Sequence, residues 1–237
     1  MCRWAFVNVT SETCEGFGCQ YLPPDNPAEF ADWVGVLAAY LLKAYGSEYA
    51  SRIRWRLGTE ANGPRWSNHG KVFEPYLQTY ALTMKKIRQV IPAAEVGPSN
   101  WVEVVGSSGN LTAGGSDAFQ YKFYSALAED RSIPLDWISV SHYGGGGRPG
   151  HPGNFPGSDY VERTPDGTTG EFEMTAMRDL AARPNASLEV MEWSILNNEL
   201  HQPTYEPSSV GTAWTAGSVA THMCHGVDRI FHWVSGH

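Results

Sequence analysis

The chain has 237 residues, of which 42% are hydrophobic and 18% charged, and a formal net charge of −8 at pH 7. This length is enough for one large core, so we expect a single domain over residues 1–237. The negative charge and the lack of a Lys/Arg cluster disfavour nucleic acid and anionic membranes as partners, because both require basic side chains against phosphate. No apolar run approaches the roughly 20 residues of a membrane span.

The N-terminal residues 1–9 are typical of a β-strand and not of a secretion signal. They lack a charged segment followed by an apolar one, and they lack a cleavage site. Four cysteines are too few for a disulfide scaffold, although Cys14 and Cys19 flank a Gly-rich turn and would be bridged only in an oxidising compartment. The sequence therefore contains no address that assigns a compartment.

The first helix is predicted to begin at Pro27, with Asn26 as its N-cap and Glu29 completing a capping box. Gly46 is expected to end it. One face of a 3.6-residue period carries the apolar side chains, which predicts a helix lying on a sheet. The predicted buried positions are Phe30, Trp33, Val34, Leu37, Leu41 and Leu42.

Strands and helices alternate along the rest of the chain. We expect strands over 53–59, 95–98, 136–141, 188–194 and 229–234, and helices over 72–90, 117–130, 171–182 and 212–225. This order predicts an α/β fold with a parallel sheet, either a barrel or a doubly wound sheet, whose site lies at the C-terminal ends of the strands. No Gly-rich phosphate-binding motif occurs, so no nucleotide cofactor is expected.

Two of the predicted strands end in a carboxylic acid, Glu60 and Glu192. Paired carboxylates are the groups that glycoside hydrolysis requires, one to donate a proton and one to attack the anomeric carbon or activate water. The alternative is that both acids are solvated surface carboxylates.

Several motifs occur together in one order. A Tyr-Gly pair at 45–46 and Trp55 precede the run Gly-Thr-Glu-Ala-Asn at 58–62; Pro-Leu-Asp-Trp-Ile-Ser at 134–139 is followed by Tyr143; and Met-Glu-Trp-Ser at 191–194 precedes Trp233. This linked order, which covers most of the chain, resembles glycoside hydrolase family 39 in the clan of retaining (β/α)8-barrel glycosidases. The resemblance implies a TIM-barrel fold and a retaining glycosidase that needs no cofactor.

The resemblance also assigns roles to residues. Glu60 would be the acid/base and Glu192 the nucleophile, with their carboxyls roughly 5 to 5.5 Å apart. Neighbouring charge and apolar walls would raise the pKa of Glu60. Tyr143 would orient Glu192, and a carbohydrate substrate would be the partner. The expected substrate-binding residues are Asn62, Thr59, His142, Tyr143, Trp193 and Trp233, with Trp66 and Trp101 as weaker candidates for stacking on sugar.

The chain departs from the family pattern in three places. Thr59 replaces the asparagine that precedes the acid, and Ser141 occupies the slot expected for a histidine. His142 directly precedes Tyr143, and adjacent strand residues point to opposite faces unless the strand has ended or is bulged. Only barrel strands 3 to 8 are visible, so we expect an incomplete barrel.

The sequence is also compatible with two other functions. One is a catalytically inactive, sugar-binding barrel remnant; another is a glycanase of a neighbouring family in the clan. The resemblance implies β-xylosides or α-L-iduronosides among the substrates, without selecting one, and this substrate class favours secretion. His142, His151 and His201 lack the spacing of a metal site, so no metal is expected, and Cys224 is expected to be buried.

Overall fold

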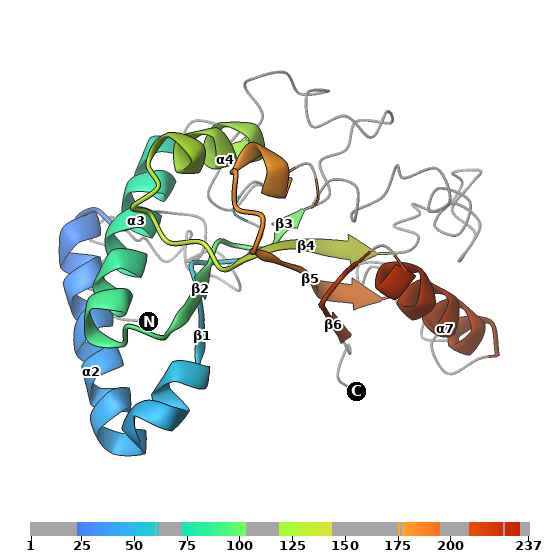
Figure 1. The fold of residues 1–237 in the computed structure, drawn as a ribbon, viewed down its shortest axis with the longest axis horizontal. Helices are drawn as coiled ribbons and strands as arrows, with labels where there is room; N and C mark the ends of the chain where they lie inside the picture. Colours follow the sequence, from blue (N-terminus) through green and yellow to red (C-terminus); the bar gives the residue numbers. More distant parts are fainter. Residues whose placement is uncertain are drawn as a thin grey trace, which may run out of the picture.

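The computed structural model describes residues 23–59, 61, 73–102, 119–143, 175, 177–194, 209–224 and 226–232. Helices and strands alternate in this part of the chain, and all strand pairs are parallel (Figure 1), so the expected α/β fold is confirmed. The elements are α2 (Pro27–Arg52), β1 (Arg54–Arg56), α3 (Phe73–Val90), β2 (Glu95–Gly97), β3 (Trp101–Val102), α4 (Phe119–Glu129), β4 (Trp137–Tyr143), β5 (Ser187–Ser194), α7 (Ser209–Cys224) and β6 (Arg229–His232).

The strands form a pair, β1-β2, and a four-stranded sheet in the order β3-β4-β5-β6. Only residues 98–100 separate β2 from β3, and Pro98 in this link has no N–H to donate to a sheet. Trp101 lies outside every strand predicted above, but it begins β3 and pairs with Val140. The two sheets thus meet at one bent segment.

Asp136 joins the two sheets a second time. Its backbone N–H donates to the Val96 carbonyl at 2.9 Å, and its carbonyl accepts from the Ser187 amide at 2.9 Å. Its carboxylate accepts from the Val96 amide at 2.7 Å and from the Arg88 guanidinium of α3 at 2.6 and 2.7 Å. One residue therefore ties β2, β4, β5 and a helix together.

Helix α2 begins as predicted, with the amides of Ala28 and Glu29 each 3.2 Å from the Asn26 side-chain oxygen. Gly46 does not end the helix. It has φ 78°, a left-handed value that kinks α2, and helical turns resume as far as Arg52.

The buried face of α2 also differs from the prediction, because Trp33 is 37% exposed. The buried positions are mostly small, namely Ala31, Val34, Gly35, Ala38 and Ala50. A Cβ atom on Gly35 would lie 2.7 Å from Lys86 Cγ, so the small side chains allow α2 to approach α3 closely.

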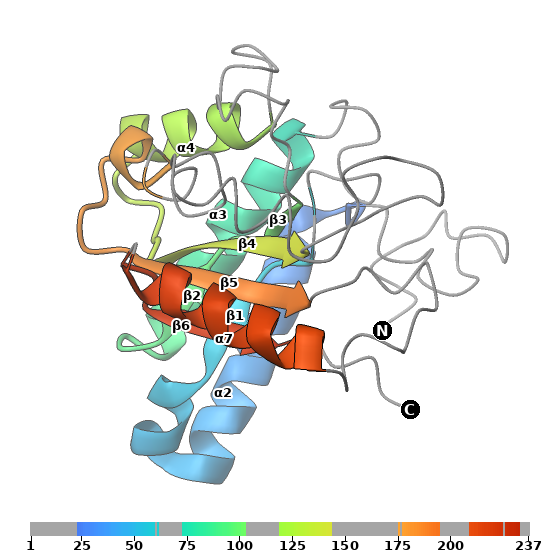
Figure 2. The same ribbon diagram turned by 90° about the vertical axis from the view of Figure 1, so that its right-hand side faces the viewer.

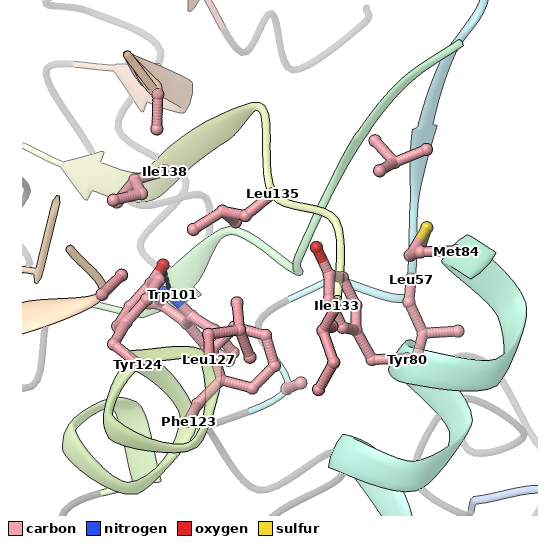
Figure 3. Packing of buried hydrophobic residues seen from close by; sticks show 14 of the residues in the cluster. Leu57, Tyr80, Met84, Trp101, Phe123, Tyr124, Leu127, Ile133, Leu135 and Ile138 are labelled. Carbon is pink, nitrogen blue, oxygen red and sulfur yellow. Dashed lines mark hydrogen bonds between the residues drawn. The ribbon is translucent and has the colours of Figure 1, made fainter. Parts of the chain in front are cut away.

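Helices α2, α3 and α4 lie together on one flank of the strands, and α7 lies beside β5 and β6 (Figures 1 and 2). Val219 of α7 packs against the same apolar core as α3 and α4. Ile138 and Val140 of β4 and Leu188 and Val190 of β5 are buried and belong to the apolar core with residues of α3 and α4. The aromatic part of this core is dense (Figure 3): Trp101 contacts Phe119, Phe123 and Tyr124. Trp101 is fully buried and donates to the Tyr124 hydroxyl at 2.6 Å, so it is a core residue and not a platform for sugar.

Polar side chains occupy the opposite face of the strands. Ser139 and Ser141 alternate with the apolar positions of β4, and Glu189 alternates with those of β5. The indole of Trp137 lies on the same face. We call this the inner face, and it also carries Arg54 and Arg56 of β1. Arg54 forms an ion pair with the fully buried Glu189 and stacks on Trp137, 4.1 Å from the ring centroid.

The inner face is curved. Arg54 of β1 meets Glu189 of β5 although β1 pairs with β2 in one sheet and β5 pairs with β4 and β6 in the other. Arg229 of β6 likewise lies 3.4 Å from both Glu189 and Glu95 of β2. Since side chains of non-adjacent strands meet, the strands bend around their polar face.

Two further findings concern the helices. Cys224, at the end of α7, is exposed, so the expectation that it is buried was wrong; it falls in the last turn of the helix, where packing ends. Among the described helices, none combines the length and the apolar composition that a membrane span needs.

Replacing Asp136 with Asn should reduce the free energy of unfolding by about 1.5–3 kcal/mol, because it removes the charge that Arg88 and the Val96 amide share. Urea unfolding measures the change. Asp32→Asn is the control, since the Asp32–Lys86 pair is exposed and is expected to contribute at most about 1 kcal/mol. Equal effects of the two substitutions would contradict the role given to Asp136.

Gly97→Ala should destabilise the fold by about 1–3 kcal/mol, because a Cβ atom there would lie 2.2 Å from the buried Trp137 ring. Gly217→Ala in α7 should instead stabilise by about 0.5–1 kcal/mol, since nothing lies within 4 Å and alanine favours a helix. Thermal unfolding of both variants tests the pair. If Gly97→Ala left the stability unchanged, Trp137 would have to move aside without cost, which would contradict the prediction.

Candidate active site

Of the expected site residues, the structure describes the side chains of Thr59, Glu192 and the weaker candidate Trp101, which lies in the core. Glu60, Asn62, Trp66 and Trp233 lie outside the described residues, as do the side chains of His142, Tyr143 and Trp193. The predicted distance between the two carboxyls and the predicted pKa of Glu60 therefore stay predictions. The backbones of His142 and Tyr143 pair with Trp193 and Ser194 at the C-terminal ends of β4 and β5.

A β-bulge places Glu192 on the inner face. Val140 of β4 pairs with Val190 of β5, but the next residue, Ser141, pairs with Glu192, so Met191 is an extra residue in β5. A bulge of this kind re-aims the side chains that follow it. Without the extra residue, Met191 would lie opposite Ser141, because a slip of one residue exchanges the two faces of a strand.

Two neutral groups hold the carboxylate of Glu192, which is partly buried. Thr59 Oγ1 lies 3.0 Å from Glu192 Oε1, and Asn100 Nδ2 lies 3.1 Å from the same oxygen. Thr59 follows β1 and Asn100 lies between β2 and β3, so three segments meet at this carboxylate at the C-terminal ends of parallel strands. Hydrogen bonds from neutral donors favour the charged form of a carboxylate.

Asn100 contacts Glu192, and the sequence alone did not single it out as a candidate site residue. Its side chain is fully buried and contacts Arg56 through Oδ1 at 2.9 Å and Ser141 Oγ through Nδ2 at 2.5 Å. The signal in the sequence was slight, namely a polar residue soon after the apolar run that ends at Pro98. Arg56 also lies 3.3 Å from the sulfur of the bulged Met191.

The residues on both sides of Glu60 are anchored to the same segment. The Tyr76 hydroxyl donates to the Leu57 carbonyl at 3.2 Å and accepts from the Ser99 amide at 2.9 Å. The Ser99 hydroxyl accepts from the Ala61 amide at 2.9 Å. The turn between β1 and Thr59 requires Gly58, whose φ is 73°.

One carboxylate, that of Glu192, lies here among polar groups. Within the described residues, no three His, Cys, Asp or Glu side chains come together as metal ligands. What the arrangement offers chemically is a carboxylate with a fixed orientation, backed by neutral donors and by one guanidinium that reaches Asn100.

No family model matches the chain. Among curated proteins it is similar to an alpha-1,4-L-rhamnosidase of Formosa agariphila, with 23% identity over 220 residues that cover 90% of this chain and 40% of that protein. The chain spans about 40% of the length of the relatives it matches.

Solved glycosidase structures share its fold. A GH39 enzyme from Xanthomonas axonopodis pv. citri has a TM-score of 0.66 and 17% identity, covering 90% of this chain and 38% of its own. A monomeric beta-xylosidase from Caulobacter crescentus CB15 gives the same TM-score and identity, with 90% and 40% covered. A family 44 xyloglucanase from Paenibacillus polymyxa has a TM-score of 0.63 at 12% identity, covering 86% of this chain and 47% of its own. The resemblance to glycoside hydrolase family 39 is thus confirmed for the fold.

The free energy of unfolding should fall as the pH rises above about 10, the ordinary pKa of tyrosine. Burial raises the pKa of Tyr76, Tyr80 and Tyr124 above that value, so the native chain keeps protons that the unfolded chain releases. Each such tyrosine contributes a loss of up to about 1.4 kcal/mol per pH unit. In the Tyr124→Phe variant, the free energy of unfolding should therefore fall less steeply with pH, by the contribution of one tyrosine. Urea unfolding between about pH 8 and 11 measures this slope. An unchanged slope in this variant would contradict the assignment.

Proposed function

We propose that this chain, which has the fold of part of a glycoside hydrolase family 39 domain, hydrolyses O-glycosidic bonds with retention of configuration. The observation that carries the proposal is the carboxylate of Glu192, held at the C-terminal end of β5 by Thr59 and Asn100. Thr59 is the direct chain neighbour of Glu60, the second acid that such a reaction needs. Glycosidases with the same fold support this choice of chemistry.

The same proposal includes the architecture. We place the six strands in one domain over residues 1–237, as part of a (β/α)8 barrel whose lumen is the inner face. Parallel pairing throughout and the contacts between β1 and β5 support a curved, closing sheet. In such barrels the active site lies at the C-terminal ends of the strands, where Thr59, Asn100 and Glu192 meet.

In the first step, a carboxylate oxygen of Glu192 bonds to the anomeric carbon while the glycosidic C–O bond breaks. Glu60 gives its proton to the leaving oxygen. In the second step, Glu60 takes a proton from water, the water oxygen bonds to the anomeric carbon, and the carboxylate of Glu192 leaves. The neutral donors on Oε1 support the role of Glu192 as nucleophile, since they stabilise its charged form.

The remaining residues are assigned to the sugar. Asn62, His142, Tyr143, Trp193 and Trp233 would line the subsite, with Tyr143 orienting Glu192. The names of the similar proteins support β-xylosides or α-L-rhamnosides as the substrate class, and exo action is part of the proposal. A second candidate is an endo-acting glycanase, favoured by the likeness to a family 44 xyloglucanase. An inactive sugar-binding domain is the remaining alternative.

The proposal predicts hydrolysis of at least one member of a panel that contains aryl β-xylosides, α-L-rhamnosides and β-glucosides, with xyloglucan as the polymer. Glu60→Gln should lower kcat by about 10²–10⁴-fold. Glu192→Gln should remove turnover, because the covalent intermediate cannot form. Proton NMR should show that the product released first has the same anomeric configuration as the substrate.

Glu129→Gln is the matched control, since this acid lies at the end of α4 and is exposed. It should keep wild-type rates. Full activity of Glu192→Gln would reject the assigned nucleophile, and release of the opposite anomer would indicate an inverting enzyme. Binding of sugar by wild type without turnover would identify the inactive alternative.

A further inference from the structure

Asn100 is a buried side chain that contacts Glu192, Thr59, Arg56 and Ser141 at once. We infer that Asn100 is a positioning residue for Glu192, and that Arg56 fixes the direction in which its amide faces. The inference rests on the proposed role of Glu192 as nucleophile. It concerns groups that do not themselves bond to the sugar.

The orientation of the Asn100 amide follows from Arg56. A guanidinium only donates hydrogen bonds, so the atom 2.9 Å from Arg56 Nη1 is the amide oxygen. The amide nitrogen then faces Glu192 Oε1 at 3.1 Å and Ser141 Oγ at 2.5 Å. A flipped amide would bring two oxygens together at Glu192 and two donors together at Arg56.

Burial makes this arrangement rigid. Asn100 is fully buried, so water cannot replace a lost partner and each flipped or missing hydrogen bond costs about 1–3 kcal/mol. Ser141 Oγ accepts from Nδ2 at 2.5 Å and is a second anchor for the amide nitrogen. The amide is therefore a fixed donor to one oxygen of the carboxylate.

Thr59 completes the network because its single hydroxyl proton has two acceptors within reach. Glu192 Oε1 lies 3.0 Å from Thr59 Oγ1, and Asn100 Oδ1 lies 2.9 Å from it. An ionised carboxylate is the stronger acceptor. When Glu192 loses its charge on bonding to the sugar, the proton can turn to Asn100 and remain hydrogen-bonded. Asn100 thus donates to Glu192 when the carboxylate is charged, and it accepts the Thr59 proton when Glu192 is bonded to the sugar.

The test uses Asn100→Ala, Arg56→Met and the double variant, assayed on an aryl glycoside that wild type cleaves. Each single substitution should lower kcat by about 10²-fold with little change in KM, because it misplaces a reacting group. The double variant should lose no more than Asn100→Ala, since Arg56 acts through Asn100. The inference would be overturned if the losses in kcat of the two single variants multiplied in the double variant, or if the single variants kept wild-type rates.

The pH profile separates positioning from loss of structure. Asn100→Asp keeps the shape but puts a second carboxylate beside Glu192, so the acid limb of kcat should move to higher pH. In the described part of the site, the charged groups that face Asn100 are Arg56 from β1 and Glu192 from β5, while β4 presents Ser141. Thr83→Val, which replaces a buried hydroxyl of α3 outside this network, is the control for a buried substitution that leaves the network intact.

If wild type cleaves no glycoside, the proposed function fails, and the inference is tested without turnover. Protein labelled with ¹³C at glutamate carboxyls reports the pH at which the Glu192 signal titrates. Asn100→Asp should shift that pH upward by at least about one unit, whereas Thr83→Val should leave it unchanged. An unshifted Glu192 signal in a folded Asn100→Asp variant would overturn the inference.

Discussion

Asp136 carries the constraint on which the arrangement of strands depends. Its backbone pairs with β2 on one side and with the start of β5 on the other, and its carboxylate binds both the Val96 amide and Arg88 of α3. Asp228 repeats part of this design at the next strand, where it exchanges hydrogen bonds with Leu188 through its carboxylate and its amide. Because each aspartate bonds to the strand beside it, these two residues hold the starts of the parallel strands in register.

A fixed register at the start of the strands determines what lies at their ends. The apolar positions of β4 and β5 face the helices, so their alternate positions must face inward, where Glu189 and Arg54 neutralise each other. Further along, the extra residue Met191 turns Glu192 onto this polar face. The candidate site is therefore the continuation, beyond a bulge, of the same inward-facing row that carries the buried ion pair.

The alternation of helices and strands was predictable because its signals are local. Asn26 caps α2 as expected, and the buried positions Tyr76, Tyr80, Met84 and Ile87 of α3 follow the helical period. Features that depend on distant packing were not predictable. Trp33 is exposed because small residues of α2 face α3, and the helix continues past Gly46. For the site, Glu192 follows from its motif, whereas Asn100 reaches it only because the β2–β3 segment bends beside β1 and β5.

The Arg54–Glu189 ion pair has a consequence for synthesis of the chain on the ribosome. The two residues are 135 positions apart, so β1 leaves the exit tunnel long before its partner is translated. Parallel sheets with such distant contacts close late, and a strand that waits unpaired is exposed to aggregation. β1 waits with guanidinium groups at Arg54 and Arg56 on one face and Trp55 between them on the other, and charged side chains of this kind discourage association of unpaired strands. The charges that later fill the inner face thus protect the nascent chain before that face exists.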